Sequence, residues 1–352
     1  MNDPLLTIVT GAPGWLGTRL TRVLSKGLPD EPRLATPRSR CLRLLVLPGL
    51  DASFTSELDQ PVEIVAGDLT DRDAVQRLCE GAAGATIFHC AGVIHPTRGI
   101  KQLFQVNHQG TRNLVEAAER AGVRRLVCVS SNSPFGCNAR PEERFDESAA
   151  YQPYRAYGRS KKLMEQAVRE CEARGRLETV VIRPPWFYGP DQPPRQTEFF
   201  TMIRRGRAPI VGGGLNRRSM AYVDNICHGL LLCEEVEQAR GQTYWIADAE
   251  PYTMNRIIDT VERLLEDEFN LSVAHKRLRL PGIASGIAGF CDTLIQAAGV
   301  YHTKIHVLSE MNKTIACTID KARQELGYEP RIALEEGMRR SITWCLEKGH
   351  KI

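Results

Sequence analysis

The sequence predicts an α/β fold in which a doubly wound parallel sheet carries a smaller C-terminal lobe. Short apolar runs alternate with amphipathic helical patterns through the first half of the chain, and this alternation favours parallel strands covered by helices on both faces. A glycine-rich turn joins the first apolar run to the first helical pattern. Beyond Arg183 the alternation loosens into proline- and glycine-rich segments, which indicates a second, less regular lobe.

The strands are predicted from short apolar runs, and the helices from apolar residues that recur at three- and four-residue spacing. The predicted strands are Leu6–Thr10, Leu42–Leu47, Val62–Val65, Thr86–His89, Leu126–Ser130, Thr179–Arg183 and Thr243–Ala247. The predicted helices are Leu16–Ser25, Asp73–Cys79, Lys101–Ala121, Ala156–Ala173 and one near Phe199–Arg205. Gly27–Arg40, rich in proline and arginine, is predicted as an exposed loop.

Two domains follow from this pattern. Residues 1–183 are predicted to form the sheet domain, and residues 184–352 mainly the second lobe, with about 219–248 returning to the sheet. The apolar stretch Leu280–Tyr301 is interrupted by Pro281, Asp292 and several glycines, so it is too broken for a membrane span. We expect amphipathic helices that cover a cleft. The preceding basic run HKRLRL leaves peripheral membrane contact as an alternative.

Composition excludes some classes of protein. Lys and Arg number 46 against 42 Asp and Glu, so no strong positive field indicates a nucleic acid partner. The eleven cysteines are scattered without close Cys-x-x-Cys pairs, and the histidines lack metal-ligand spacing, so no metal is predicted. The N-terminus shows no secretory signal pattern. These features predict a cytoplasmic protein.

The string TGAPGWLG places Gly11, Gly14 and Gly17 between a predicted strand and a predicted helix. A turn without Cβ atoms lets backbone amides and the helix N-terminus approach a pyrophosphate. The spacing Gly-x-x-Gly-x-x-Gly departs from the Gly-x-Gly-x-x-Gly fingerprint. The loop therefore indicates a dinucleotide site without defining its class.

Tyr157 and Lys161 occur as YGRSK at the start of a predicted helix. Their four-residue separation places both side chains on one helix face. A tyrosine with a pKa near 10 is too weakly acidic to act as a base at neutral pH, but a neighbouring ammonium stabilises its phenolate. The pair is therefore a candidate for moving a proton.

Together these motifs resemble the extended short-chain dehydrogenases/reductases, which have a Rossmann sheet and a substrate-binding lobe. Four further strings occur in that family's order: AGDLTD, HCAG, VNHQGTRNLVEAA and RPPWFYGP. The resemblance implies that the glycine loop, adenine-side and backbone-contact positions hold the cofactor, together with the catalytic pair. These cofactor-binding residues are Gly11, Pro13, Gly14, Trp15, Leu16, Gly17, Asp68, Leu69, Ala91, Gly92, Tyr157, Lys161 and Pro184.

The same resemblance implies the catalytic group. Ser131, in VCVSSNSPFG, would hydrogen-bond the substrate oxygen, and Tyr157 would exchange its proton. Lys161 would lower the tyrosine pKa and hold the nicotinamide ribose, and Asn107 would support the lysine through backbone and water contacts. A hydride would pass between the carbinol carbon and nicotinamide C4.

NAD is favoured as cofactor, and NADP stays open. An acid that closes the second strand would bind the ribose hydroxyls of NAD, whereas an arginine would favour the NADP phosphate. Pro48 stands at that position and Asp51 three residues later. The arginines that could reach a phosphate are Arg33, Arg38, Arg40 and Arg43, although surface charge is the expected role of most of them.

The substrate is left between two branches of the family. NRRSMAYVDN resembles the stretch where sugar-nucleotide enzymes bind diphosphate, which makes Arg217 and Arg218 substrate-binding candidates and predicts that Asp224 caps the next helix. Asn132 and Ser133 replace the Asp-Glu pair common in dehydratases, so a nucleotide-sugar epimerase is the first hypothesis.

The second hypothesis is an enzyme similar to 3β-hydroxysteroid dehydrogenases that acts on a bulky apolar alcohol. It rests on the apolar Pro281–Tyr301 segment. The later string TIDKARQELGYEP is a predicted helix with a Gly327 stop and a Pro330 turn; it is similar across many members of the family and does not identify a substrate. A dinucleotide-binding redox sensor without catalysis is the third hypothesis. By resemblance, we expect a homodimer through the helices Lys101–Ala121 and Ala156–Ala173.

Overall fold

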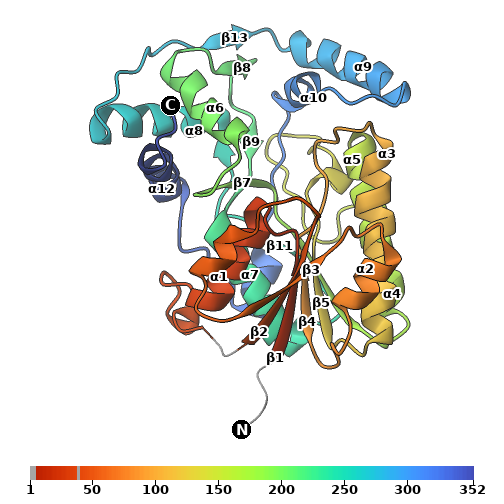
Figure 1. Cartoon of the computed structure of the whole chain (residues 1–352). Helices are drawn as coiled ribbons and strands as arrows, with labels where there is room; N and C mark the ends of the chain where they lie inside the picture. Colours follow the sequence, from red (N-terminus) through yellow and green to blue (C-terminus); the bar gives the residue numbers. More distant parts are fainter. Residues whose placement is uncertain (1–4, 38–39) are drawn as a thin grey trace.

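The computed structural model describes residues 5–37 and 40–352, which form a parallel sheet covered on both faces and a C-terminal lobe above one edge (Figure 1). The seven sheet strands run in the order β11-β6-β5-β4-β1-β2-β3. Their bounds are β1 Leu5–Thr10, β2 Arg40–Val46, β3 Val62–Ala66, β4 Thr86–His89, β5 Arg125–Val129, β6 Glu178–Arg183 and β11 Thr243–Trp245. The prediction of a doubly wound parallel sheet is confirmed.

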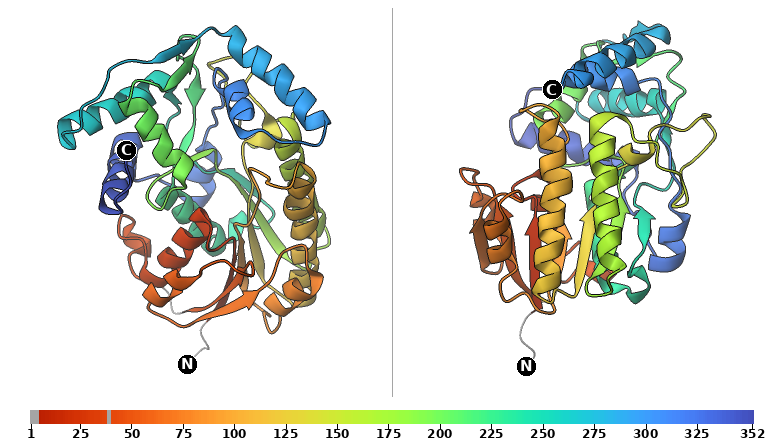
Figure 2. Two further views of the ribbon diagram at one scale, coloured as in Figure 1. Left: turned by 45° about the horizontal axis from the view of Figure 1, so that its top comes forward. Right: turned by 90° about the vertical axis from the view of Figure 1, so that its right-hand side faces the viewer.

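Two layers of helices cover the sheet (Figure 2). One layer contains α1 (Trp15–Lys26), α7 (Val223–Glu235) and α11 (Asp320–Leu326), whose apolar side chains pack in one core with β2 and β5. The opposite layer contains α2 (Arg72–Leu78), α4 (Thr111–Arg120) and α5 (Arg155–Glu172). These faces are buried because each helix carries an apolar stripe that meets a strand surface on which almost every residue is apolar.

The strand order reverses next to β1, which pairs with β2 on one side and β4 on the other. Loops that leave neighbouring strands in opposite directions open a crevice at the carboxyl ends of the strands, where ligands of such folds bind. The glycine loop follows β1, and Cys90–Gly92 follows β4. The topology therefore brings two of the predicted cofactor segments together.

The helix predicted over Lys101–Ala121 is divided into three parts. An α-helical turn, α3 (Lys101–Leu103), leads into a π-helical segment, η3 (Phe104–Gly110), and then into α4. Asn107 lies inside the π-helical segment. Such wide turns commonly occur at functional sites because they redirect individual side chains.

The C-terminal lobe is built from short strand pairs and six helical segments. Its strands are β7 (Trp186–Tyr188), β8 (Pro209–Val211), β9 (Arg217–Arg218), β10 (Met220–Tyr222), β12 (Tyr252–Thr253) and β13 (Leu278–Leu280). Its helical segments are α6 (Pro194–Arg204), α8 (Met254–Arg263), the π-helical η6 (Leu264–Glu268), α9 (Ile283–Ala297), α10 (Thr303–Glu310) and α12 (Leu334–Glu347). None of the helices in the described part of the chain is long and apolar enough to cross a membrane.

The prediction that Gly27–Arg40 is an exposed loop holds only in part for its described residues, because several of them are exposed while others are buried. Leu28 and Leu34 are buried in the core beside α1, and a short 3-10 turn, η1 (Pro32–Leu34), shapes the connection. Glu31 is also buried and accepts a hydrogen bond from Arg331 at 3.0 Å. The segment thus docks against residues 300 positions later in the chain, which local composition does not reveal.

Candidate active site

The glycine loop closes tightly between β1 and α1. Gly11 has a φ of +94°, and a Cβ there would lie 2.6 Å from the backbone nitrogen of Ala91. A Cβ at Gly17 would lie 2.4 Å from the carbonyl carbon of Gly11. Gly14 precedes α1 and provides no side-chain cap. The first amides of α1 can therefore donate to an anionic group.

This loop forms one wall of a cavity of about 1050 Å³ that is also lined by the C-terminal lobe. Most of the residues predicted to bind cofactor or substrate line it together. They are Gly11, Pro13, Gly14, Trp15, Leu16, Gly17, Asp68, Leu69, Ala91, Gly92, Ser131, Tyr157, Pro184 and Arg218. Asp68 holds its own loop, because one of its carboxylate oxygens accepts both the N–H and the hydroxyl of Thr70.

Tyr157 and Ser131 lie side by side in the cavity wall. Tyr157 stands in the first turn of α5, and Ser131 follows the end of β5. Burial raises the pKa of Tyr157 to about 12, although a hydrogen bond with Ser131 acts in the opposite direction. The Ser131 hydroxyl also accepts the N–H of Ser133 at 3.2 Å. The phenol thus keeps its proton at neutral pH and has a hydroxyl partner beside it.

Lys161 lies one helical turn beyond Tyr157, behind the cavity wall. Its ammonium donates to the carbonyl oxygen of Val129 at 2.9 Å, and burial lowers its pKa. A Cβ on Gly92 would lie 3.2 Å from this ammonium and 3.3 Å from Oδ1 of Asn107. Only a residue as small as glycine lets the backbone pass at this point. Lysine, asparagine and the cofactor segment after β4 are therefore in one cluster.

Asn107 fixes the backbone of that segment. Its Oδ1 accepts the N–H of Val93 at 2.7 Å, and its amide donates to the Val93 carbonyl at 2.9 Å and to Ser160 Oγ at 3.0 Å. The amide therefore ties the loop after β4 to the helix that carries Tyr157 and Lys161.

A buried ion pair supports α5, and it was not predicted from the sequence. Glu165 is fully buried and accepts hydrogen bonds from Arg183 at 2.7 Å, Ser130 at 2.5 Å and Tyr151 at 2.7 Å. These bonds join β5, β6 and the segment before α5 to the helix beneath Tyr157. The available signal was a glutamate within the apolar stripe of a predicted helix, since such groups are buried only with partners.

His89 is a packing residue in the core. It lies fully buried between the hydroxyls of Thr10 at 2.7 Å and Thr111 at 2.8 Å. Burial, with a smaller contribution from the charge of Lys161, lowers its pKa to about 3. Its neutral ring therefore links the glycine loop strand to α4.

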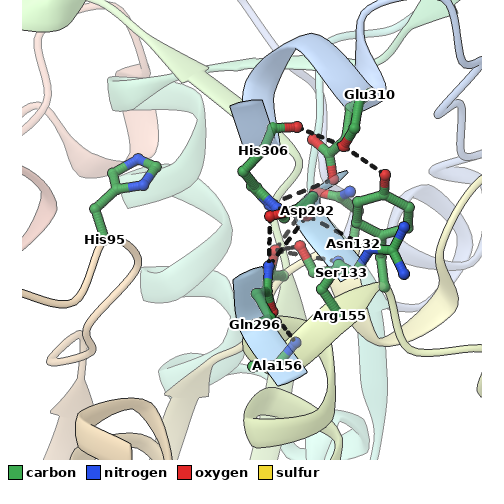
Figure 3. A network of polar contacts seen from close by, with 12 residues as sticks. His95, Asn132, Ser133, Arg155, Ala156, Asp292, Gln296, His306 and Glu310 are labelled. Atoms are coloured by element: carbon green, nitrogen blue, oxygen red, sulfur yellow. Dashed lines mark hydrogen bonds and ion pairs between the residues drawn. The ribbon is translucent and has the colours of Figure 1, made fainter. Parts of the chain in front are cut away.

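The C-terminal lobe reaches the start of α5 through a polar cluster (Figure 3). Gln296 of α9 accepts the backbone N–H of Ala156 at 3.0 Å, and Asp292 accepts from Gln296 at 2.9 Å and pairs with His306 of α10 at 2.9 Å. Burial raises the pKa of Asp292, but the bonds from His306 and Gln296 outweigh it and leave the pKa below its ordinary value. We call α9 and α10 together the lid. The lid thus caps Ala156, the residue before Tyr157.

The apolar Pro281–Tyr301 segment, on which the hypothesis of an apolar substrate rested, does not line the cavity through α9. Of these two helices, α10 contributes side chains to the cavity lining, including Val307 and Leu308. α9 turns its polar side inward, against the protein. The reason is the cluster of Asp292 and Gln296, which can be satisfied only against α5 and α10.

The two candidate arginines of β9 have different positions. Arg218 lines the cavity and donates to the carbonyl of Glu310 at 2.6 Å, whereas Arg217 is exposed and does not belong to the cavity lining. The prediction that Asp224 caps α7 is wrong, because no side-chain cap is present at that helix start. Asp224 instead accepts two hydrogen bonds from Arg19, which ties α7 to α1.

Comparison with known proteins assigns the family. The NAD dependent epimerase/dehydratase family matches residues 7–247, which include the glycine loop, Ser131, Tyr157 and Lys161. The chain belongs to this family. Its members are NAD-dependent enzymes of the extended short-chain dehydrogenase/reductase type, so the predicted superfamily, enzyme class and NAD cofactor are confirmed.

Relatives of this family member include both predicted branches. Uncharacterized protein y4nL of Sinorhizobium fredii is 51% identical over 99% of this chain and 97% of its own length. A 3beta-hydroxysteroid-dehydrogenase/decarboxylase of Arabidopsis thaliana is 27% identical over 95% of this chain and 78% of its own. N-acetyl-alpha-D-glucosaminyl-diphospho-ditrans,octacis-undecaprenol 4-epimerase of Escherichia coli is 26% identical over 98% and 96%.

Solved structures share the fold of this family member. The UDP-glucose 4-epimerase of Thermotoga maritima, determined with UDP-glucose, superposes with a TM-score of 0.76 at 18% identity, covering 98% of this chain and all of that chain. This likeness extends through the C-terminal lobe as well as the sheet.

The residues present fit the dinucleotide of the family. Gly11 and Gly17 let the loop close tightly in front of α1, because a Cβ at either position would overlap backbone atoms, and the uncapped start of α1 suits a pyrophosphate. The second strand ends without an acid in the cavity, because Asp51 bonds to Ser53 in its own turn and Leu47 and Leu50 line the wall.

Two of the arginines considered for an NADP phosphate are engaged elsewhere. Arg40 forms a buried ion pair with Glu234 at 2.8 Å, and Arg43 pairs with Glu63 at 2.7 Å. Arg33 is exposed in η1, and Arg38 lies outside the described residues.

Proposed function

We propose that the chain is an NAD-dependent dehydrogenase or ketoreductase that acts on the secondary alcohol or ketone of a bulky, mainly apolar molecule. The observation that carries this proposal is the composition of the cavity beyond Tyr157 and Ser131. Ten large apolar side chains line it there, beside charged ones such as Arg195, Glu198 and Lys304. The ten are Trp186, Phe187, Phe199, Met202, Met254, Leu280, Val307, Leu308, Met311 and Ile315. Such walls gain little from a sugar but bury a large hydrocarbon well.

The proposal assigns catalytic roles to the residues around Tyr157, and the positions of Tyr157 and Ser131 in the cavity wall support it. Ser131 donates to the substrate oxygen and holds it beside the phenol. Tyr157 takes the hydroxyl proton during oxidation and returns it during reduction. Lys161, one turn further along the same helix face, is assigned the role of favouring the phenolate. The charge of Arg195 in the cavity wall also acts to lower the pKa of Tyr157. Asn107 positions the loop against which Lys161 lies. NAD, when bound along the glycine loop, supplies the carbon that accepts or returns the hydride.

A nucleotide-sugar epimerase is the second candidate, favoured by Arg218. Its Nε is buried without a hydrogen-bond partner while the residue lines the cavity. An unsatisfied buried guanidinium nitrogen is costly, and a phosphate oxygen would satisfy it. Arg217 is exposed outside the cavity lining and therefore gives this candidate no support.

The test separates the candidates by how they handle the cofactor. The purified protein is incubated with NAD or NADP and panels of hydroxysteroids, other bulky apolar alcohols and UDP-sugars. A dehydrogenase accumulates reduced cofactor with an apolar alcohol, which near-ultraviolet absorbance measures. An epimerase recycles its cofactor and changes sugar stereochemistry, which product chromatography measures. Binding of dinucleotide without turnover in every panel would favour the redox sensor.

Three features beyond the reaction belong to the same proposal. The chain divides into a nucleotide-binding domain, residues 1–183, and a mainly substrate-binding lobe, residues 184–352, from which β11 returns to the sheet. It pairs into a homodimer through the outer faces of α4 and α5. It is cytoplasmic, which its eleven unpaired cysteines support because reduced thiols persist there.

A further inference from the structure

Helix α9 has its polar side buried and its apolar side exposed. Its four large exposed apolar side chains are Ile283 (71%), Ile287 (58%), Phe290 (67%) and Leu294 (56%). Spacings of four, three and four residues place all of them on one face of the helix. Ser285, Asp292 and Gln296 occupy the opposite, buried face. We call the four apolar side chains the α9 stripe.

Two further exposed apolar side chains lie near the α9 stripe in the chain, one before the helix and one after it. Leu278 of β13 is 50% exposed, and Val300, directly after α9, is 56% exposed. Singly exposed apolar residues are ordinary, but a continuous row of large ones marks a surface that meets another apolar phase. β13 and α9 follow one another along the edge of the molecule opposite the N-terminus (Figure 1).

The charged residues near the α9 stripe indicate which apolar phase it meets. Residues 271–309 contain four Lys or Arg and a single acid, Asp292. One of the four, Arg277, is paired with Asp259 and Glu262, which leaves Lys276, Arg279 and Lys304. Because Asp292 is fully buried, the exposed charge of this segment is entirely positive. Lys276 and Arg279 are exposed beside β13, and Lys304 is exposed on α10. An apolar row flanked by exposed cations complements an anionic lipid surface.

We propose that the α9 stripe docks the protein on an anionic membrane surface. The helix lies parallel to the surface, its apolar face enters the boundary between headgroups and acyl chains, and Lys276 and Arg279 pair with anionic headgroups. The polar cluster of Figure 3 holds the other face of α9 on α5 and α10, so docking requires no detachment of the lid. Since α10 lines the cavity, the docked lid lies between the bilayer and the candidate active site.

Vesicle flotation tests this proposal with the full-length protein. Vesicles of phosphatidylcholine alone are compared with vesicles that also contain phosphatidylglycerol. The wild-type protein should float with the anionic vesicles and be released by high salt. The double variant Ile287→Ser/Phe290→Ser should partition about tenfold more weakly, because two large apolar side chains leave the interface. Lys276→Gln/Arg279→Gln should lose the preference for anionic over neutral vesicles.

Leu346→Ser is the matched control, since Leu346 is also a helical leucine, 38% exposed, but lies on α12. It should float like the wild type. Failure of the wild-type protein to bind anionic vesicles would overturn the proposal. Equal binding by Ile287→Ser/Phe290→Ser would also overturn it. The same holds if, in the absence of lipid, the wild-type protein is a dimer and this variant is a monomer, because the stripe would then be a dimer interface. Flotation involves no turnover, so its outcome is independent of the proposed dehydrogenase activity.

Discussion

At the scale of single residues, Tyr157 is held in its protonated form by the same burial that aligns it for chemistry. The phenol lies next to Ser131, while the ammonium of Lys161 is directed to the Val129 carbonyl. A base must be deprotonated to accept the substrate proton, so alcohol oxidation should become faster as pH rises toward the tyrosine pKa of about 12. Ketone reduction needs the protonated phenol and should not gain in the same way.

Replacement of Tyr157 by Phe removes the proton acceptor and leaves the ring in place. Turnover should fall by about 10²–10⁴-fold, the usual contribution of a general acid or base, while NAD binding stays nearly unchanged. Steady-state kinetics and calorimetric titration with NAD measure the two effects. Tyr154→Phe is the control, because its hydroxyl bonds to Ser309 of the lid. Most of the activity surviving in Tyr157→Phe would refute the catalytic role.

His89 should make the folded state sensitive to acid. Its pKa of about 3 lies below the ordinary value of 6.5, so below pH 6.5 the unfolded chain binds a proton that the folded chain refuses. The free energy of unfolding should therefore decrease as pH falls from about 6.5 to about 3, by up to about 1.4 kcal/mol per pH unit. Urea unfolding of the wild type and of His89→Gln measures this contribution. The same slope in both proteins would assign the effect to other groups.

At the scale of elements, tight contacts between loops and helices determine what the glycine positions tolerate. Gly11 meets backbone atoms of the segment after β4, whereas Gly286, inside α9, faces open space. What could be predicted from the sequence also differs between local and long-range features. The bounds of β4 matched its apolar run, because a short buried strand is determined by its own residues. The outward face of α9 was not predicted, because helical periodicity shows that two faces exist but not which one is buried.

The two glycines give a matched pair of substitutions. Gly11→Ala should lower the free energy of unfolding by at least about 1–3 kcal/mol and abolish NAD binding, because its φ is positive and its Cβ would overlap the backbone of Ala91. Gly286→Ala should raise stability by about 0.5–1 kcal/mol through helix propensity alone. Thermal unfolding and NAD titration of both variants check this contrast. Normal NAD binding by Gly11→Ala would exclude the loop as the pyrophosphate site.

At the scale of the whole molecule, the candidate site is assembled from both ends of the chain. Ser131, Tyr157 and Lys161 could be predicted because their spacing and order along the sequence carry the chemistry. The residues that hold them could not, because Glu165 with Arg183, Arg19 with Asp224 and Gln296 with Ala156 meet only after folding. These contacts connect segments 18, 205 and 140 residues apart. No local pattern encodes such pairs.

Gln296→Leu tests whether the lid and α5 act as one unit. The variant leaves the N–H of Ala156 and the carboxylate of Asp292 without their amide partner, and each lost buried bond costs about 1–3 kcal/mol. Turnover should fall more than NAD affinity, because α5 carries Tyr157 while the glycine loop is untouched. Gln296→Glu keeps an acceptor for Ala156 but loses both N–H donors to Asp292 and adds a second negative charge beside it, so it should lower activity as well. Equal kinetics in wild type and Gln296→Leu would show that the cap is dispensable.

The bond between Gln296 and Ala156 also affects the order in which the protein can assemble during its synthesis. During synthesis the ribosome releases all seven sheet strands once Trp245 has emerged, yet the start of α5, which carries Tyr157, still lacks its bond to Gln296. The side chains that complete the helix start are made about fifty residues later, together with α10. A nascent chain can therefore make the sheet strands and the glycine loop early, whereas α11, which covers the sheet, and the cap of α5 both come from the last part to be translated. The order of synthesis thus delays the reaction until the lid exists to enclose it.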